Sequence, residues 1–357
     1  MQPSRPAFAP ARWIVLFVAS LTACGPAGGA SQTAGGVVTS TPSQPATSTP
    51  VASALAWPSG SPPVARFAGR IAFVAFDGVG SGAYMVNGET GSVRRLTEGN
   101  VDPTGIAWSP DGSTLAVSRT ICPPDPCGTV IALLDVGTGS LRDVTPLQAG
   151  IVDGDPAFSP DGRRLVFRSN RSAGGDAFTN GLFTVSIDGG ALTSIPRSSK
   201  FTGAPRWSPD GAWIGYLEAH DFEPSRLIAV HPDGSGMRVI VEDSQLSEGF
   251  AWSPDGRLVA FRRSGPTEVG ANGENVTFPV LWRVSDDGTD ARPFFGSALH
   301  SGPPAWAADG RSIAFIGGVL TQPEQLWIAA VDGSTVGSVP LGDLVPDVFA
   351  WTATSGG

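Results

Sequence analysis

The sequence predicts an all-β fold, a closed ring of six four-stranded antiparallel blades, from three observations. A six-letter phrase, AWSPDG, stands at Ala107–Gly112 and again at Ala251–Gly256, and near copies lie between and after them. Each copy is followed by a short stretch in which apolar and polar residues alternate, as in a half-buried strand. Two incomplete repeats, one at each end of the repeat region, each supply what the other lacks.

The aromatic residue of each copy sets the period. The six aligned positions lie 45 to 54 residues apart: Trp108, Phe158, Trp207, Trp252, Trp306 and Trp351. A period of that size is typical of a propeller or a solenoid, and the absence of helical periodicity favours a β-propeller. We expect each aromatic to pack between neighbouring blades. Ligand stacking by an aromatic at the rim is the alternative.

The letters Ser-Pro-Asp-Gly predict a tight turn, because Pro suits the first turn position and Gly a left-handed one. A strand follows the turn, as in RRLVFRS, and further strands follow in LFTVSIDGG from Leu182 and RVIVED from Arg238. Each period therefore holds four strands. We expect the turn aspartates to cap the turns, and a repeated set of metal ligands is the alternative: Asp111, Asp161, Asp210, Asp255 and Asp309.

The number of blades follows from the two incomplete repeats. Residues 69–99 contain the second, third and fourth strands of a blade but no first strand, whereas VFAW, which ends at Trp351, is a first strand with nothing after it. Together they make one blade, and with five complete repeats the total is six. We expect the last strand to pair with Ile71–Leu96 and close the ring without a broad open edge.

The amino terminus predicts export. Arg5 and Arg12 precede a short apolar run, Trp13–Ser20, which is too short to span a membrane. The letters LTAC at Leu21–Cys24 resemble the bacterial lipoprotein signal, and this resemblance implies that Cys24 carries a lipid and begins the mature chain. An ordinary cleaved signal is the alternative.

The domain organisation follows from this reading. We expect a signal peptide at 1–23, a lipidated Cys with a Pro-, Ser-, Thr- and Gly-rich tether at 24–65, and the propeller at 66–357. Residues 25–65 contain no charged side chain and too little apolar surface to fold. The predicted location is extracytoplasmic, in the periplasm or on the cell surface, with the lipid holding the protein at the membrane.

The charge balance narrows the class of partner. The net charge is −9, which argues against sequence-independent binding of nucleic acid and favours basic or cationic partners. We expect a monomer.

The repeated phrase resembles the TolB-type β-propeller repeat, in which AWSPDG, a strand ending in IAF and a later LW…DG recur. The resemblance covers residues 69–353, and SPDG stands intact at 109, 159, 208 and 253. It implies the propeller fold and several functions, because the same repeat occurs in partner-binding proteins, peptidase propeller caps and sensors. TolB itself has an additional amino-terminal α/β domain, which the tether replaces here, so its particular partner is not carried over.

One group of carboxylates is the candidate ligand site. The segments before the innermost strands should converge on one mouth of the central channel and bring an acidic rim there: Asp102, Asp153, Asp155, Glu248 and Asp347. Such a rim would focus a negative potential and capture a cation, such as Ca²⁺, or a basic peptide. A solvated acidic rim that aids solubility is the alternative.

Two cysteines are expected to form a disulfide. Cys122 and Cys127 lie in CPPDPC, after the second strand of a blade; in an exported chain a disulfide is favoured, and two thiols are too few ligands for structural zinc. Cys122–Cys127, Ala173–Asn180 and Pro266–Pro279 are the longest insertions, and we expect them to be recognition loops.

These features predict a binding or scaffolding module of the cell envelope whose partner is a protein or a glycan. The alternative is a propeller hydrolase or lyase, of the lactonase type, with a metal in the central channel; a sensor domain is a third possibility. The chain has three histidines and no Gly-x-Ser-x-Gly motif, so we assign no catalytic residue.

Overall fold

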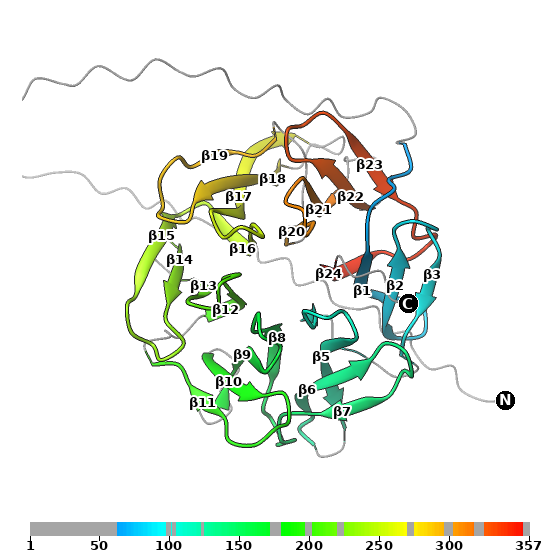
Figure 1. The fold of residues 1–357 in the computed structure, drawn as a ribbon, viewed down its shortest axis with the longest axis vertical. Coiled ribbons are helices and arrows are strands. Elements are labelled where there is room, and N and C mark those ends of the chain that lie inside the picture. Colours follow the sequence, from blue (N-terminus) through cyan, green and yellow to red (C-terminus); the bar gives the residue numbers. More distant parts are fainter. Residues whose placement is uncertain are drawn as a thin grey trace, which may run out of the picture. The chain divides into compact units, whose positions relative to one another are not determined.

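The computed structural model describes residues 63–97, 101, 105–122, 125–171, 180–196, 202–219, 225–269, 275–295, 303–317 and 325–352. The chain divides into two units, Met1–Thr49 and Pro50–Gly357, and all described residues belong to the second. This unit is a ring of six four-stranded antiparallel sheets (Figure 1), which confirms the predicted six-bladed β-propeller. None of the described residues forms a helix with the length and apolar character that crossing a membrane requires.

Each of the six blades contains four strands. The first contains β1 (Arg70–Phe76), β2 (Ser81–Asn87), β3 (Val93–Arg95) and β24 (Pro346–Thr352). The second contains β4 (Ile106–Trp108), β5 (Thr114–Ile121), β6 (Gly128–Asp135) and β7 (Leu141–Asp143), and the third β8 (Asp153–Phe158), β9 (Arg164–Ser169), β10 (Gly181–Ser186) and β11 (Thr193–Ser194). The fourth contains β12 (Thr202–Trp207), β13 (Ile214–Glu218), β14 (Ser225–Val230) and β15 (Arg238–Asp243). The fifth contains β16 (Leu246–Trp252), β17 (Leu258–Val269), β18 (Asn275–Ser285) and β19 (Arg292–Pro293), and the sixth β20 (Ala305–Trp306), β21 (Ser312–Gly317), β22 (Gln325–Ala330) and β23 (Val336–Val339).

The first blade closes the ring as predicted. Its innermost strand, β24, comes from the other end of the repeat region and pairs antiparallel with β1, with Phe73 opposite Phe349 and Ile71 opposite Trp351. The inner edge of β1 is therefore paired, and the last strand of the fold completes the first sheet (Figure 1).

The repeated phrase forms the turn between the first two strands of a blade. In the second blade the Ser109 hydroxyl donates to Asp111 Oδ1 at 2.6 Å and accepts the Thr114 N–H at 3.0 Å, while the Ser113 N–H donates to the same carboxylate oxygen at 3.0 Å. Gly112 has a φ of 70°, in the left-handed region that glycine adopts without strain. The hydroxyl–carboxylate pair recurs at Ser159, Ser208 and Ser253, so these aspartates are turn caps.

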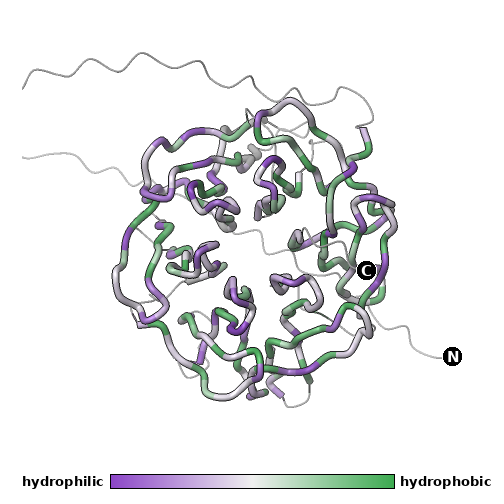
Figure 2. The backbone as a smooth tube through the Cα atoms, viewed as in Figure 1, coloured by the Kyte–Doolittle hydropathy of each residue, from purple (hydrophilic) through white to green (hydrophobic). Residues whose placement is uncertain are grey.

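The hydrophobic core lies between the blades. The cluster between the first and second blades joins Val74 of β1, Leu115 of β5 and Trp108 of β4. The indole N–H of Trp108 donates to the Ala350 carbonyl of the preceding blade at 3.1 Å. Hydrophobic stretches recur in the blades around the ring (Figure 2). The repeated aromatic is therefore an inter-blade residue, as the sequence predicted.

A short segment before β1 makes a second closure. Val64 forms an isolated parallel bridge with Ser338 of β23, the outermost strand of the sixth blade, and the Ala65 N–H donates to the Ser338 carbonyl at 2.8 Å. Phe67 then packs edge-on against Trp351 at a centroid distance of 5.4 Å. Residues 63–65, which were predicted to belong to the tether, therefore pair with the propeller.

Replacing Gly88 by Ala should weaken this second closure. A Cβ at Gly88 would lie 2.1 Å from the Phe67 carbonyl oxygen and 2.4 Å from its ring, so the segment before β1 has to shift. We expect the free energy of unfolding to fall by about 1–3 kcal/mol, the usual cost of overpacking. Denaturant unfolding and limited proteolysis near Phe67 measure it. Gly203→Ala is the matched control, since nothing lies within 4 Å of its Cβ, and equal stability of the two variants would contradict the prediction.

Candidate functional site

Four of the five predicted acidic residues lie near the starts of inner strands. Asp153 and Asp155 are in β8, Glu248 is in β16 and Asp347 is in β24. They belong to the strands, not to the segments before them, because the inner strands extend past a register shift, as between Gly154 and Ala157 in β8. Asp102 and the Glu248 side chain lie outside the described part of the molecule. The exposed Asp347 makes an electrostatic or hydrogen-bonding contact of its own.

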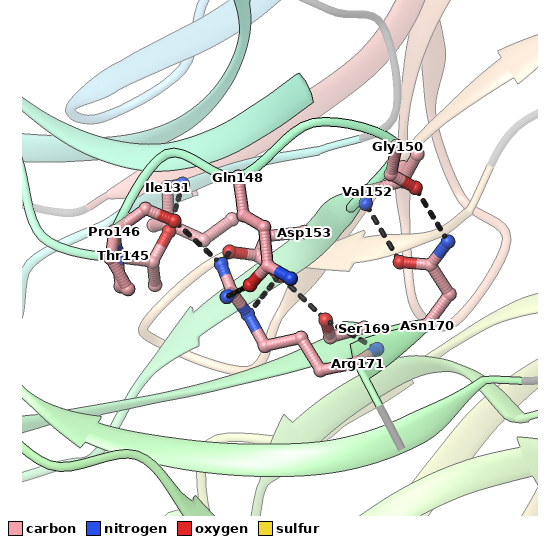
Figure 3. Close-up of polar contacts among 10 residues, drawn as sticks. All are labelled: Ile131, Thr145, Pro146, Gln148, Gly150, Val152, Asp153, Ser169, Asn170 and Arg171. Atoms are coloured by element: carbon pink, nitrogen blue, oxygen red, sulfur yellow. Dashed lines mark hydrogen bonds and ion pairs between the residues drawn. The ribbon is translucent and has the colours of Figure 1, made fainter. Parts of the chain in front are cut away.

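Asp153 is buried and fully engaged. Its carboxylate accepts the Ser169 hydroxyl at 2.6 Å and is held by Arg171, whose Nε lies 3.1 Å from Oδ1 and whose Nη2 lies 2.7 Å from Oδ2 (Figure 3). The side chain of Asp153 is completely inaccessible and that of Arg171 is 12% exposed. Because both oxygens are bonded and the charge is neutralised, Asp153 is not presented to an external cation.

Arg171 also ties down the connection that leads into β8. Its Nη2 donates to the Pro146 carbonyl at 2.8 Å, and its Nη1 lies 3.5 Å from the Gln148 side-chain oxygen (Figure 3). The neighbouring Asn170, which is 1% exposed, donates to the Gly150 carbonyl at 3.0 Å and accepts the Val152 N–H at 2.8 Å. The side-chain amide of Asn170 is therefore buried and hydrogen-bonded at both ends.

Asp155 is paired with a different arginine. Its carboxylate forms an ion pair with Arg168 of β9 and accepts the Ala204 N–H of the fourth blade at 3.5 Å. Asp155 has a φ of 53°, a left-handed backbone conformation that costs free energy for a residue with a side chain. The two ion pairs hold the inner edge of the third blade, and the hydrogen bond from Ala204 joins it to the fourth.

Arg206 is a second cation near Asp155. It is half-buried on β12, and desolvation lowers its pKa from the usual 12.5 while the Asp155 carboxylate opposes that change. Arg206 was not among the predicted site residues, although the sequence contains a signal for it. Arg206 occupies the place that alanine takes in the other copies of the phrase: Ala107, Ala157, Ala251, Ala305 and Ala350.

The described residues contain no group of three or more His, Cys, Asp or Glu side chains that could hold a metal ion. Of the predicted rim, Asp153 and Asp155 are engaged by arginines.

Two of the predicted recognition loops can be placed. Cys122 and Cys127 are joined by a disulfide in the connection between β5 and β6, as the sequence indicated. Pro266–Pro279 is not a simple loop, because β17 and β18 continue as a hairpin through most of it, with Thr267 opposite Thr277. Alternating residues there extend the strands past a register shift, and the role of this hairpin in recognition stays a prediction. Ala173–Asn180 lies outside the described residues except for Asn180.

The turn aspartates should make the fold sensitive to acid. Hydrogen bonds from the serine hydroxyls, and then from backbone N–H groups, lower the pKa values of Asp111, Asp161, Asp210 and Asp255 from the usual 3.8. The unfolded chain thus binds more protons than the native state near these pKa values. Stability is present above the unfolded pKa and is lost as the pH falls through the folded pKa.

We expect the free energy of unfolding to be nearly flat above about pH 5 and to decrease below about pH 4. Changing all four turn aspartates to Asn keeps the hydrogen-bond acceptor but removes the titration, so the acid slope should become shallower. Urea unfolding at several pH values measures both slopes. Parallel slopes for the variant and the wild type would show that other groups cause the acid sensitivity.

Comparison with known proteins places the chain among propellers. Residues 51–307 match the model of the TolB beta propeller domain. The tricorn protease homolog 1 of Streptomyces coelicolor is 31% identical over 156 residues, which cover 41% of this chain and 14% of that protein. The chain thus spans about a seventh of the length of that relative.

Solved structures show the same fold at low identity. TolB from Acinetobacter baumannii gives a TM-score of 0.61 at 16% identity and covers 79% of this chain and 66% of its own. An oligogalacturonate lyase in complex with manganese gives 0.52 at 18% identity over 77% and 75% of the two chains. With the family model matching more than half of its length, this chain belongs to the TolB beta propeller domain family.

Proposed function

We propose that this protein is a membrane-anchored extracytoplasmic lipoprotein whose β-propeller binds a protein or a glycan of the cell envelope and acts as a scaffolding module. The observation that carries the proposal is the pairing of Asp153 with Arg171 and of Asp155 with Arg168. These carboxylates, predicted to be ligands, serve instead to hold blade-end connections in place. A rigid ring that positions its connecting segments suits recognition.

The sequence before the propeller supports the location. The lipoprotein-like signal ending at Cys24 and the uncharged tether suit a domain held at a membrane surface. The net charge of −9 favours a partner with a basic surface.

A fractionation experiment tests the anchor. The full-length protein should be found in the membrane fraction, and Cys24→Ser should release it or leave it held by an uncleaved signal without incorporation of labelled fatty acid. Cys122→Ser is the control, because it leaves lipidation intact. Equal fatty-acid incorporation in the wild type and Cys24→Ser would contradict the anchor.

Crosslinking in native membranes tests the binding function. A specific envelope protein or glycan should be recovered with the wild type and identified by mass spectrometry, and purified partner should then bind the propeller directly. A tightly held stoichiometric divalent ion together with hydrolase or lyase activity would overturn the proposal in favour of an enzyme.

A further inference from the structure

The contacts between neighbouring blades follow one rule. The residue that begins the second strand of one blade packs near the repeated aromatic of the next blade. The Arg70 guanidinium lies over the Trp108 ring, 4.8 Å from its centroid, and that of Arg164 lies over Trp207 at 5.1 Å. At the next two junctions the equivalent positions are apolar: Trp213, directly before β13, shares a hydrophobic cluster with Trp252, and Leu258 shares one with Trp306.

The junction between the second and third blades departs from this rule on both sides. Thr114 takes the place of the arginine, tryptophan or leucine, and Phe158 is the only repeated aromatic that is not tryptophan. A pocket of about 240 Å³ opens at this position. Its apolar wall is formed by Leu133, Phe158 and Ile187. Ser312, the equivalent residue of the sixth blade, is also small, but at that junction Phe67 packs against the repeated aromatic, Trp351.

The junction before this one shows what the pocket can accept. Arg70 stacks on Trp108, and its Nη2 donates to the Gly112 carbonyl at 2.7 Å. In the third blade the corresponding turn glycine is Gly162, which lines the pocket, and the corresponding ring is Phe158. A guanidinium in the pocket would therefore meet an aromatic face and a turn carbonyl in the arrangement that Arg70 already uses.

The charge of the pocket favours such a guest. Asp111 from one turn and Asp161 from the next both line it. The hydroxyls of Ser109 and Ser159 donate to these carboxylates at 2.6 Å and 2.5 Å and favour their ionised form. Two carboxylates beside an aromatic ring attract a cation, and the planar guanidinium stacks on the ring and donates in a fork, which an ammonium group does not.

A resident arginine nearby does not exclude a second one. Arg142 donates to the Ile187 carbonyl at 2.9 Å at this junction. At the preceding junction Arg94 makes the same contact to the Val136 carbonyl at 2.8 Å, and Arg70 is accommodated beside it. The repeat thus already contains a junction with two guanidinium groups.

We propose that the pocket between the second and third blades binds an arginine side chain of a protein partner, stacked on Phe158 and held by the Gly162 carbonyl, Asp111 and Asp161. The arginine of the partner takes the place that Arg70 and Arg164 fill at their own junctions and that the short side chain of Thr114 does not fill. The biological role of the pocket rests on the proposed binding function, whereas its chemistry can be tested apart from it.

Peptide titration of the full-length protein tests the chemistry. The probes are a glycine-flanked arginine peptide and its lysine and citrulline counterparts, followed by the NMR shifts of labelled methyl groups of Leu133 and Ile187. We expect the arginine peptide to bind at least tenfold more tightly than the other two. Equal affinities for the three peptides, or shifts that leave both methyl groups unchanged, would overturn the proposal.

Thr114→Arg is the decisive variant, because it places a guanidinium group of the protein itself in the pocket. It should lower the affinity for the arginine peptide at least tenfold and raise the melting temperature. Asp161→Asn, which keeps the turn acceptor but removes its charge, should weaken binding severalfold and serves if the first variant does not fold. Val79→Arg is the control, since it adds the same charge at a residue that is 93% exposed in the first blade, and binding should stay unchanged.

The two proposals fail in different ways. Direct binding of an envelope partner without arginine-peptide binding would overturn the pocket and leave the scaffolding function standing. Selective arginine binding by a chain for which membranes yield no partner would overturn the scaffolding function and leave the pocket standing.

Discussion

Deleting residues 346–357, which contain β24, should abolish cooperative folding of the ring. The deletion removes the innermost strand of the first blade and leaves the inner edge of β1 unpaired from Arg70 to Ala75. The side chains of β24 pack into two hydrophobic clusters, one on each face of the blade. Phe349 packs into the cluster shared with the sixth blade, while Val348 and Ala350 pack into the cluster shared with the second.

The loss should exceed about 5 kcal/mol, comparable to the whole stability of an ordinary domain. Burial of a phenylalanine side chain alone contributes about 1.5–3 kcal/mol. Trp108 also loses the Ala350 carbonyl to which its indole N–H donates. Circular dichroism and calorimetry should find no cooperative transition. A chain ending at Thr352 is the control and should unfold like the wild type; a cooperative transition in the chain ending at Val345 would refute the closure.

Replacing Arg171 by Met should have the next largest effect on stability. The change leaves the buried Asp153 carboxylate without its ion-pair partner, and removing one member of a buried pair usually costs about 3–5 kcal/mol. It also releases the Pro146 carbonyl. Urea unfolding measures the difference. The exposed pair of Arg119 with Asp143 gives the matched control, because Arg119→Met should cost at most about 1 kcal/mol.

A second substitution separates charge from packing. Asp153→Asn combined with Arg171→Met removes both charges, so the double variant should be more stable than Arg171→Met alone. If instead the effects of the two single changes add, the buried charge is not the cause and lost packing of the arginine side chain is.

The fold could be predicted because its determinants are local and repeated. Ser-Pro-Asp-Gly specifies the turn through contacts within six residues, as between Ser109 and Thr114. The period then sets the number of blades, and the two incomplete repeats set the closure. Pairing of β24 with β1 is a long-range contact, yet it follows from counting strands.

The site was harder to predict because its contacts depend on register. Asp153 lies opposite Ser169, but the register shift between Gly154 and Ala157 decides which arginine each carboxylate meets. Counting carboxylates in the sequence therefore overestimated the negative charge that is available to a ligand. The segment before β1 contacts β23 through backbone groups, so the pattern of side chains in the sequence does not predict this contact. A comparison of equivalent positions in the repeats identifies further candidate residues, because Arg206, Phe158 and Thr114 all differ from their counterparts.

The origin of β24 has a consequence for how the protein is made. Phe73 and its partner Phe349 are separated in the chain by the other five blades, so the first sheet stays incomplete while those blades emerge from the ribosome. Contacts of such long sequence separation form slowly. We expect the ring to lock only after this last strand has been synthesised, so the earlier blades stay in an open ring until then.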